Sequence, residues 1–297
     1  MCLAVDVGGT KIAAGLVDRR GRLLRRAQVP TTPTTDPEVL FGALKGLLAS
    51  LRDAAGEAGW ARVVACGAGC GGPMSPGGEA VSPLNIPAWR DFPLCRRLAE
   101  HTGLPTAVDN DAKALALGEG WVGAARGVAD FVAMVVSTGV GGGIVLDGRL
   151  LQGGEGNAGH IGHVVVEAAG RPCSCGGRGC LEAEASGLAI TAMTGRPPAE
   201  AGADVVARTG RLVGRAVASV ANLLDLRLCV VAGSVALGFG APFFAAAAEE
   251  LAEHARLSFS AGTRIVPAGL GDGGPLVGAG AVGWALAADP GRITGAR

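Results

Sequence analysis

The sequence predicts an α/β fold built from a duplicated unit, and three observations lead to this prediction. A strand, a glycine turn and a second strand occupy residues 3–18, and the same design returns within residues 131–150. In both copies Gly-Arg-Leu follows the second strand. Elsewhere strand-like runs alternate with helix-like ones, which is typical of α/β layers. Because no low-complexity linker separates the two halves, we expect two lobes that share a cleft.

The remaining elements are predicted from apolar runs and the turn residues that bound them. Between the two hairpins we expect helices at 37–58, 94–102 and 112–122, strands at 63–67 and 106–108, and a Gly-Pro turn at 71–73. After the second hairpin we expect helices at 186–193, 203–224, 242–257 and 276–288, and a strand at 228–232. Two unrelated hairpins are the alternative explanation of the repeat.

Composition excludes several classes of partner. The chain has 297 residues, enough for one large domain or two ordinary ones. Its 26 Lys and Arg residues balance 26 Asp and Glu residues, so no net charge attracts nucleic acid or an anionic membrane. Tyrosine is absent, which leaves few aromatic platforms for single-stranded nucleic acid. We therefore expect a protein that binds neither nucleic acid nor membrane.

Cysteine usage and hydropathy bear on location. The chain has eight cysteines and no recognisable secretory leader, which favours a reducing cytoplasm. Residues 228–248 carry no charge over a length that raises the question of a membrane span. Gly233, Gly238 and Pro242 interrupt this stretch, so a strand, a turn and the start of a helix are the preferred interpretation.

A cluster of metal-binding residue types lies in the second half. Cys173, Cys175 and Cys180 occur in one glycine-rich loop, with His163 upstream. Three thiolates and one imidazole match a closed tetrahedral zinc site, which braces a loop and leaves no position for a substrate. Such a brace would fix Glu182, which follows closely. Three incidental buried cysteines are the alternative.

Two glycine turns, at residues 8–10 and 138–143, are candidate phosphate sites. Backbone N–H groups in such turns can surround phosphate oxygens. Neither turn matches the P-loop or the dinucleotide fingerprint. Thr10 and Thr138 offer hydroxyls to a phosphate, and Asp6 could hold magnesium through water or simply stabilise its turn.

Two polar positions in the first half are candidates for chemistry. Asp111 begins a predicted helix, where it could cap the helix or accept a proton from a hydroxyl that attacks phosphorus. Asn85 lies between Pro83 and Pro87, where its amide could bind a sugar hydroxyl or shape a turn.

These motifs resemble those of the ROK family (repressors, open reading frames and sugar kinases). The resemblance runs from residue 3 to about residue 288 and rests on LAVDVGGTKIAAGLVD, PLNIPAW, VDNDAKALALGE, STGVGGG, AGHIGH and CSCGGRGCLEAEASG, in this order. It implies a duplicated ribonuclease-H-like fold, as in actin-like ATPases, with two lobes around a cleft. We expect a small lobe at 1–112 plus about 277–297, and a large lobe with the zinc loop at 113–276.

The resemblance also implies the roles of individual residues. Asp111 resembles the catalytic base. The residues that would contact the sugar are Gly72, Asn85, Asn110, His160, His163 and Glu182. The residues that would bind ATP with Mg²⁺ are Asp6, Gly8, Gly9, Thr10, Lys11, Thr138, Gly139, Gly141 and Gly233. The ligands of a structural Zn²⁺ would be His163, Cys173, Cys175 and Cys180.

The chain departs from the family pattern at His160, where sugar kinases of the family usually have glutamate. A neutral imidazole offers one donor and one acceptor, whereas a carboxylate offers only acceptors. An unpaired sugar hydroxyl costs about 1–3 kcal/mol, so we expect altered sugar choice or affinity. A second zinc ligand is the alternative role for His160. Ser234 is a further, mild departure. Glu184 stands where tyrosine is common, and we expect this change also to shift the sugar pocket.

The function implied is ATP-dependent phosphorylation of a hexose or N-acetylhexosamine at its 6-hydroxyl. Glucose is the first candidate, with N-acetylmannosamine, N-acetylglucosamine, glucosamine and mannose open, and polyphosphate an open alternative to ATP. The competing hypotheses are a non-catalytic ROK sugar-binding protein and a sugar-responsive regulator without its DNA-binding domain, for which the first strand near Leu3 leaves no room. A cytoplasmic homodimer is expected from the resemblance.

Overall fold

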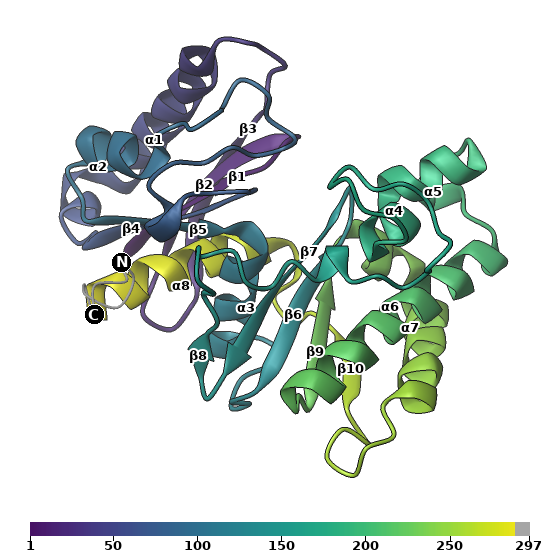
Figure 1. Ribbon diagram of the computed structural model, residues 1–297. Coiled ribbons are helices and arrows are strands. Elements are labelled where there is room, and N and C mark those ends of the chain that lie inside the picture. Colours follow the sequence, from purple (N-terminus) through teal and green to yellow (C-terminus); the bar gives the residue numbers. More distant parts are fainter. Residues whose placement is uncertain (289–297) are drawn as a thin grey trace. The chain divides into compact units, whose positions relative to one another are not determined.

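The computed structural model describes residues 1–288 and divides the chain into two compact units (Figure 1). The first unit comprises Met1–Gly123, Gln152–Ala158 and the described part of Leu270–Arg297. The second comprises Ala124–Leu151 and Gly159–Gly269. The lobe boundary expected from the sequence, after residue 112, falls inside helix α3 (Asp111–Val122), whereas the units separate after this helix.

The sheet of the first unit has five strands in the order β3-β2-β1-β4-β5. Its strands are β1 (Cys2–Val7), β2 (Lys11–Val17), β3 (Leu23–Pro30), β4 (Ala65–Cys70) and β5 (Thr106–Asn110). Strand β1 pairs antiparallel with β2 and parallel with β4, β2 pairs antiparallel with β3, and β4 pairs parallel with β5.

The sheet of the second unit repeats this topology strand for strand, in the order β8-β7-β6-β9-β10. Its strands are β6 (Phe131–Val136), β7 (Val140–Leu146), β8 (Arg149–Leu150), β9 (Leu228–Ala232) and β10 (Arg264–Pro267). Strand β6 pairs antiparallel with β7 and parallel with β9, as β1 does with β2 and β4. The predicted duplicated α/β fold is confirmed.

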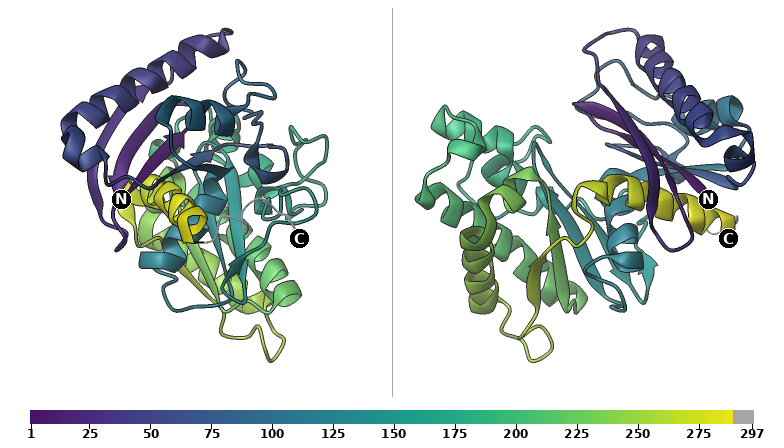
Figure 2. Two further views of the ribbon diagram at one scale, coloured as in Figure 1. Left: turned by 90° about the vertical axis from the view of Figure 1, so that its left-hand side faces the viewer. Right: turned by 180° about the vertical axis from the view of Figure 1, so that it is seen from behind.

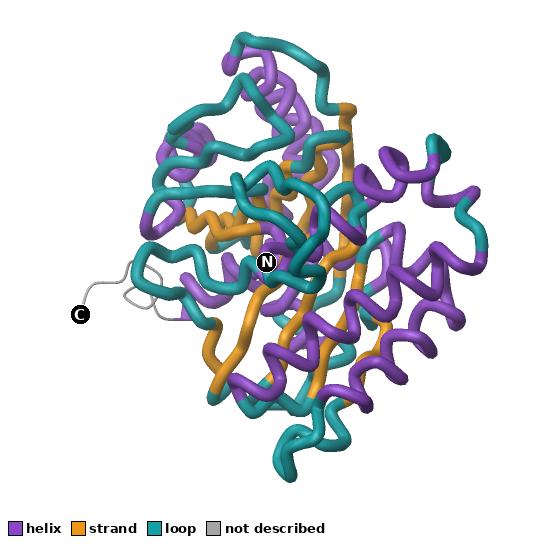
Figure 3. Tube along the Cα trace, turned by 45° about the vertical axis from the view of Figure 1, so that its right-hand side comes forward, coloured by secondary structure: helices purple, strands orange, loops and turns teal. Residues whose placement is uncertain are grey.

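Helices lie beside the strands in both units (Figure 3). In the first unit they are α1 (Pro37–Trp60), α2 (Leu94–Thr102), α3 and α8 (Gly274–Ala288), with 3-10 turns η1 (Pro76–Gly78) and η4 (Gly271–Gly273). In the second they are α4 (Leu181–Ala185), α5 (Gly187–Thr194), α6 (Ala203–Leu224) and α7 (Ser234–His254), with η2 (Ile161–His163) and η3 (Pro198–Glu200).

Both faces of the first sheet are buried, because side chains of β1 alternate between two cores. Leu3 and Val5 join the core that contains residues of α1 and α2. Ala4 points the other way and meets Leu276 and Ala279 of α8. Figure 2 shows α8, in yellow, alongside these strands. Asp6 follows in the same alternation, so its side chain belongs to the face that α8 and α3 cover.

The glycines of α8 allow its backbone to touch the elements beside it. A Cβ at Gly67 of β4 would lie 2.1 Å from the carbonyl oxygen of Ala279, and one at Gly278 would lie 2.5 Å from that of Ala114 in α3. Only glycine fits such contacts. They hold α3, and therefore Asp111 at its first position, against the sheet.

The structure corrects several predicted boundaries. Helix α7 begins at Ser234 and not at Pro242, with non-helical dihedrals at Gly240 that mark a kink just before the proline. Strands β3 and β10 and the short helix α4 were not predicted. Among the described residues, α7 is the one helix long and apolar enough to cross a membrane, and 39% of its apolar window is buried. This is weak evidence for a span, since core helices also pass such a test.

Candidate active site and metal site

Asp6 ends β1 and lies under the first glycine turn. It is 9% exposed, and its pKa is raised to about 7 by burial and by the nearby Asp111 carboxylate, against the opposing charge of Lys11. The N–H of Gly8 donates to the carbonyl of Lys11 at 3.0 Å and closes the turn. The end of β1 and the turn after it thus form one continuous segment, in which Thr10 and Lys11 are exposed. The predicted ATP-binding residues in this segment are Asp6, Gly8, Gly9, Thr10 and Lys11.

Asp111 is the first residue of α3, and Asn110 is its N-cap. The Asn110 side-chain oxygen accepts the N–H of Ala112 at 3.0 Å, so the capping role considered for Asp111 belongs to Asn110. The Asp111 carboxylate accepts the same N–H at 2.8 Å and is otherwise on the exposed end of the helix. A Cβ at Gly72 would lie 3.4 Å from the Asn110 side-chain nitrogen, which brings these two predicted sugar contacts together.

The loop that carries Asn85 packs on the first glycine turn. A Cβ at Gly9 would lie 2.7 Å from the Cβ of Asn85, so a side chain at Gly9 would displace the loop. Arg90 fixes the loop from within, because its Nη1 lies 2.9 Å from the carbonyl oxygen of Pro83 and 3.0 Å from that of Ile86. The exposed Asn85 side chain is therefore presented by a rigid support.

In the second unit, Glu182 of α4 binds the second glycine turn. Its carboxylate accepts the N–H of Val140 at 2.8 Å. The same oxygen lies 2.7 Å from the position of a Cβ at Gly139. The Gly187 N–H also donates to the carbonyl of Ser137 at 2.7 Å, so α4, α5 and the turn form one rigid group.

Gly233 forms a third turn beside the second one. Its φ is 101°, and a Cβ there would lie 2.2 Å from the carbonyl oxygen of Val136. The hydroxyls of Ser137 and Ser234 are 2.9 Å apart. Ser234, noted as a departure from the family, thus joins the turn at residues 137–139. Gly141 lies within β7, opposite Val135.

His163, Cys173, Cys175 and Cys180 converge, as the sequence predicted. Their ligand atoms all lie within 4.8 Å of one another. The His163 Nδ1 is 3.7 Å from the Cys173 sulfur, and the Cys175 and Cys180 sulfurs are 3.7 Å apart. Tetrahedral zinc with Zn–S bonds of about 2.3 Å separates sulfurs by about 3.8 Å. The geometry and donor set fit a tetrahedral metal ion.

The thiols of this cluster differ in acidity. The pKa of Cys175 is lowered, first by the N–H of Gly177 and then by the neighbouring thiols. Burial and the neighbouring thiols raise the pKa of Cys180 to about 12. A bound divalent cation favours the thiolate form of every ligand, so metal binding would release protons from this loop.

His160 lies outside the group of four ligand atoms. Its ring stacks on that of His163, with 6.0 Å between centroids and 17° between planes. Since His163 directs Nδ1 at Cys173, His160 lies next to a candidate metal ligand without belonging to the cluster.

Lys113 is a site residue that the sequence analysis missed. Its side chain is 2% exposed and forms a 3.1 Å ion pair with Asp109, one residue before the Asn110 cap. Its ammonium also donates to the Gln152 side chain and, at 2.9 Å, to the carbonyl of Gly156. It thereby fastens the segment Gln152–Ala158 to α3. A lysine inside the apolar run of α3 is the signal that could have indicated it.

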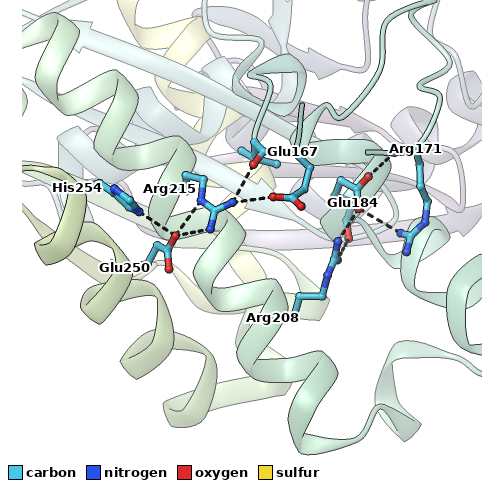
Figure 4. Close-up of polar contacts among 8 residues, drawn as sticks. Glu167, Arg171, Glu184, Arg208, Arg215, Glu250 and His254 are labelled. Carbon is cyan, nitrogen blue, oxygen red and sulfur yellow. Dashed lines mark hydrogen bonds and ion pairs between the residues drawn. The ribbon is translucent and has the colours of Figure 1, made fainter. Parts of the chain in front are cut away.

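Glu184 does not remain available as a sugar contact. Its side chain is 2% exposed and lies between Arg171 and Arg208 (Figure 4). Burial opposes its ionisation, but the N–H of Arg171 and the Arg208 guanidinium outweigh this effect and lower its pKa. The sequence led us to expect that Glu184 shifts the sugar pocket. In the structure its carboxylate instead forms buried ion pairs with Arg171 and Arg208.

Comparisons with known proteins show which family the chain belongs to. The ROK family model matches residues 2–285. An N-acetylmannosamine kinase of Citrobacter koseri is 39% identical over 254 residues, which cover 80% of this chain and 84% of that protein. The structure of a ROK hexokinase from Thermus thermophilus has a TM-score of 0.83 at 34% identity, covering 97% of this chain and 99% of that one.

A third relative has been solved with ligands. The structure of a ROK family glucokinase from Streptomyces griseus, in complex with glucose and AMPPNP, has a TM-score of 0.81 at 30% identity, with 96% of this chain and 99% of that chain covered. The family match spans nearly the whole described chain. The protein therefore belongs to the ROK family and has its actin-like ATPase fold.

Proposed function

We propose that this protein is an ATP-dependent sugar kinase that phosphorylates an N-acetylhexosamine or hexose at its 6-hydroxyl. The observation that carries the proposal is the position of Asp111. It begins α3 beside the buried Asp6, next to the Asn110 and Gly72 pair, so a proton acceptor lies among groups suited to a sugar and a phosphate. Kinase relatives at 30–39% identity support it.

In the proposed reaction Asp111 accepts the proton of the sugar hydroxyl as its oxygen attacks the γ-phosphorus. The new O–P bond forms in line with the bond to the β-phosphate, which breaks, and ADP leaves with that electron pair. Such a base contributes about 10²–10⁴ in rate. Most of the remaining catalysis comes from positioning and from charge stabilisation by N–H groups of the glycine turns.

Asp6 and the metal loop would support this step in different ways. Bound Mg²⁺ supplies charge neutralisation at the phosphates, and Asp6 would hold it through water. Zn²⁺ held by His163 and the three cysteines would supply structural support. His163 directs Nδ1 to the cluster, which leaves its Nε2 to donate to a sugar hydroxyl.

We propose N-acetylmannosamine as the first substrate to test. The relative from Citrobacter koseri that bears this name is 39% identical, whereas the glucokinase solved with glucose is 30% identical. Glucose, ranked first from the sequence, becomes the second candidate. His160 is the residue expected to decide between them, because its imidazole replaces a carboxylate among the expected sugar contacts.

The test is an ADP-release assay with ATP and a panel of sugars, on protein of measured zinc content. We expect turnover with at least one sugar and a product phosphorylated on O6, identified by NMR. The variant Asp111→Asn keeps the size of the side chain and removes the proton acceptor. It should lower kcat by about 10²–10⁴ while sugar binding, measured by calorimetry, stays within a few-fold. Normal turnover by this variant would refute the role of Asp111.

The two competing hypotheses are not favoured. A non-catalytic sugar binder has no need of Asp111 beside Asp6, and the relatives named above are kinases. The same assay tests the phosphate donor, because polyphosphate is compared with ATP. Cytoplasmic location and a homodimer stay predictions from the sequence.

A further inference from the structure

We propose that Glu184 is a positioning residue that holds helix α4, and with it Glu182, in the geometry that sugar binding requires. The proposal deepens the function proposed above and rests on it for the role of Glu182. For this residue the sequence indicated a departure from the family pattern and an effect on the sugar pocket.

The contacts of Glu184 are short and buried. One carboxylate oxygen accepts the backbone N–H of Arg171 at 2.6 Å, and the other accepts the Nη2 of Arg208 at 2.6 Å. The Nη1 of Arg171 lies 3.5 Å from the second oxygen. With the side chain 2% exposed, solvent does not screen these interactions as it does at a surface.

Helix α4 needs such support because it is only five residues long. A helix of this length has no stability of its own and takes its position from tertiary contacts. Arg208 supplies one, because its Nη1 also donates to the main-chain carbonyl of Glu184 at 3.0 Å. Arg208 belongs to α6, a helix of 22 residues that packs in the core of the second unit.

The same carboxylate fixes the entry to the cysteine loop. Arg171 lies two residues before Cys173, and its N–H is held by Glu184. A Cβ at Gly170 would lie 2.5 Å from a Glu184 oxygen, so the chain passes directly over the carboxylate. Glu184 therefore joins the loop entry, α4 and α6 at one point, through contacts that involve none of the four metal ligands.

Glu182 depends on this arrangement because it lies two residues before Glu184 on the same short helix. Its carboxylate reaches the N–H of Val140 at 2.8 Å. A shift of α4 would change this contact and move the carboxylate away from the second glycine turn. The effect on the sugar would pass through Glu182, since Glu184 itself is enclosed.

Helix α6 also supplies a matched control (Figure 4). Arg215 forms a 2.7 Å ion pair with Glu250 of α7 and a 2.8 Å pair with Glu167. The Glu250 side chain is 7% exposed, so it is a buried carboxylate of the same kind. Glu250→Gln removes an ion pair from the same helix without touching α4.

The experiment compares Glu184→Gln with Glu250→Gln in the zinc-loaded protein. We expect Glu184→Gln to raise the sugar KM about tenfold, with kcat and the ATP KM within about threefold. Backbone amides of residues 170–185 should exchange hydrogen about tenfold faster, and zinc should pass more quickly to a chromogenic chelator. Glu250→Gln should lower Tm but leave the sugar KM, the hydrogen exchange of residues 170–185 and the rate of zinc transfer near wild type.

Equal effects of the two variants on sugar KM and exchange, or unchanged exchange in Glu184→Gln, would overturn the proposal. Should Glu184→Gln fail to fold, Arg208→Lys keeps the charge and loses the forked contact, and the same changes are expected in weaker form. If the wild-type protein phosphorylates no sugar, the proposed function fails, while exchange and zinc release still decide the role of Glu184.

Discussion

Asp6 and Asp111 both lie beside Gly69, close enough that the charge of Asp111 raises the pKa of Asp6. A Cβ at Gly69 would lie 3.5 Å from the Asp111 Cα and 3.8 Å from an Asp6 carboxylate oxygen. Asp6 and Gly69 are register partners on β1 and β4, and Asp111 begins α3, so the sheet and this helix set the distance between the two carboxylates. Two carboxylates so placed favour a cation near them.

This pair predicts a pH-dependent stability. Asp6 has its pKa raised from 3.8 to about 7, so the folded state binds the proton more tightly than the unfolded chain. The stability that protonation provides is full below about pH 4 and is lost as pH rises through about 7. The side chain of Asp6→Asn stays uncharged at every pH, as protonated Asp6 does, so this variant keeps that stability. In magnesium-free buffer its Tm should match the Tm of wild type at pH 4 and exceed it at pH 8.

The control for this prediction is Asp111→Asn. It removes the second cause of the raised pKa, so the pH dependence attributable to Asp6 should shrink. A constant difference in Tm between Asp6→Asn and wild type from pH 4 to pH 8 would contradict the assignment. We also expect Asp6→Asn to lose most kinase activity, a result that would show that Asp6 is retained for function at a cost in stability.

Part of the contribution of Lys113 to stability should depend on the charge of Asp109. Lys113→Met would leave a largely buried carboxylate without its cation, which lowers the free energy of unfolding by about 3–5 kcal/mol. Adding Asp109→Asn should recover part of this loss, so the double variant should be more stable than the sum of the single effects predicts. Urea denaturation measures all three. Strict additivity would show that the pair is not coupled.

His160→Glu should change sugar preference. A carboxylate restores acceptors where the imidazole offers one donor and one acceptor, and one hydroxyl left unpaired is worth about tenfold in affinity. We expect the ratio of kcat/KM for N-acetylmannosamine to that for glucose to change by about tenfold. His160→Gln, which keeps a donor and an acceptor, should stay closer to wild type. Zinc content is measured in each variant because His160 stacks on His163.

Metal analysis tests the cysteine loop. Protein purified without chelators should contain about one zinc per chain, and Cys173→Ser should lose it together with sugar affinity. Cys95→Ser is the control, since Cys95 donates to the carbonyl of Thr106 in the first unit and should leave metal content unchanged. Equal zinc in Cys173→Ser and wild type would exclude the proposed ligand set.

The fold was largely predictable because the hairpins carry their own turn signals. Strand β3 escaped prediction since Arg25 and Arg26 leave it exposed and polar, and β10 has only four residues. The start of α7 was misplaced because Gly240 and Pro242 look like a boundary, whereas the structure accommodates them as a kink within one helix.

For the site, sequence reasoning worked where the residues lie close together in the chain. The cysteine cluster is of this kind, whereas the cap considered for Asp111 proved to be its neighbour Asn110. Lys113 and Glu184 were missed or misread because their partners lie far along the chain, at Gln152 and at Arg208. Such pairs are decided by topology, which spacing in one sequence does not reveal.

The contact of α8 with β4 and α3 has a consequence for biosynthesis. Residues of α8 complete the first unit, yet they emerge from the ribosome after the whole second unit has been made. The second unit can therefore assemble during translation, whereas the region holding Asp6 and Asp111 waits for α8. Competence for catalysis would then depend on residues made after the whole second unit, so a chain that stops short of α8 should lack kinase activity.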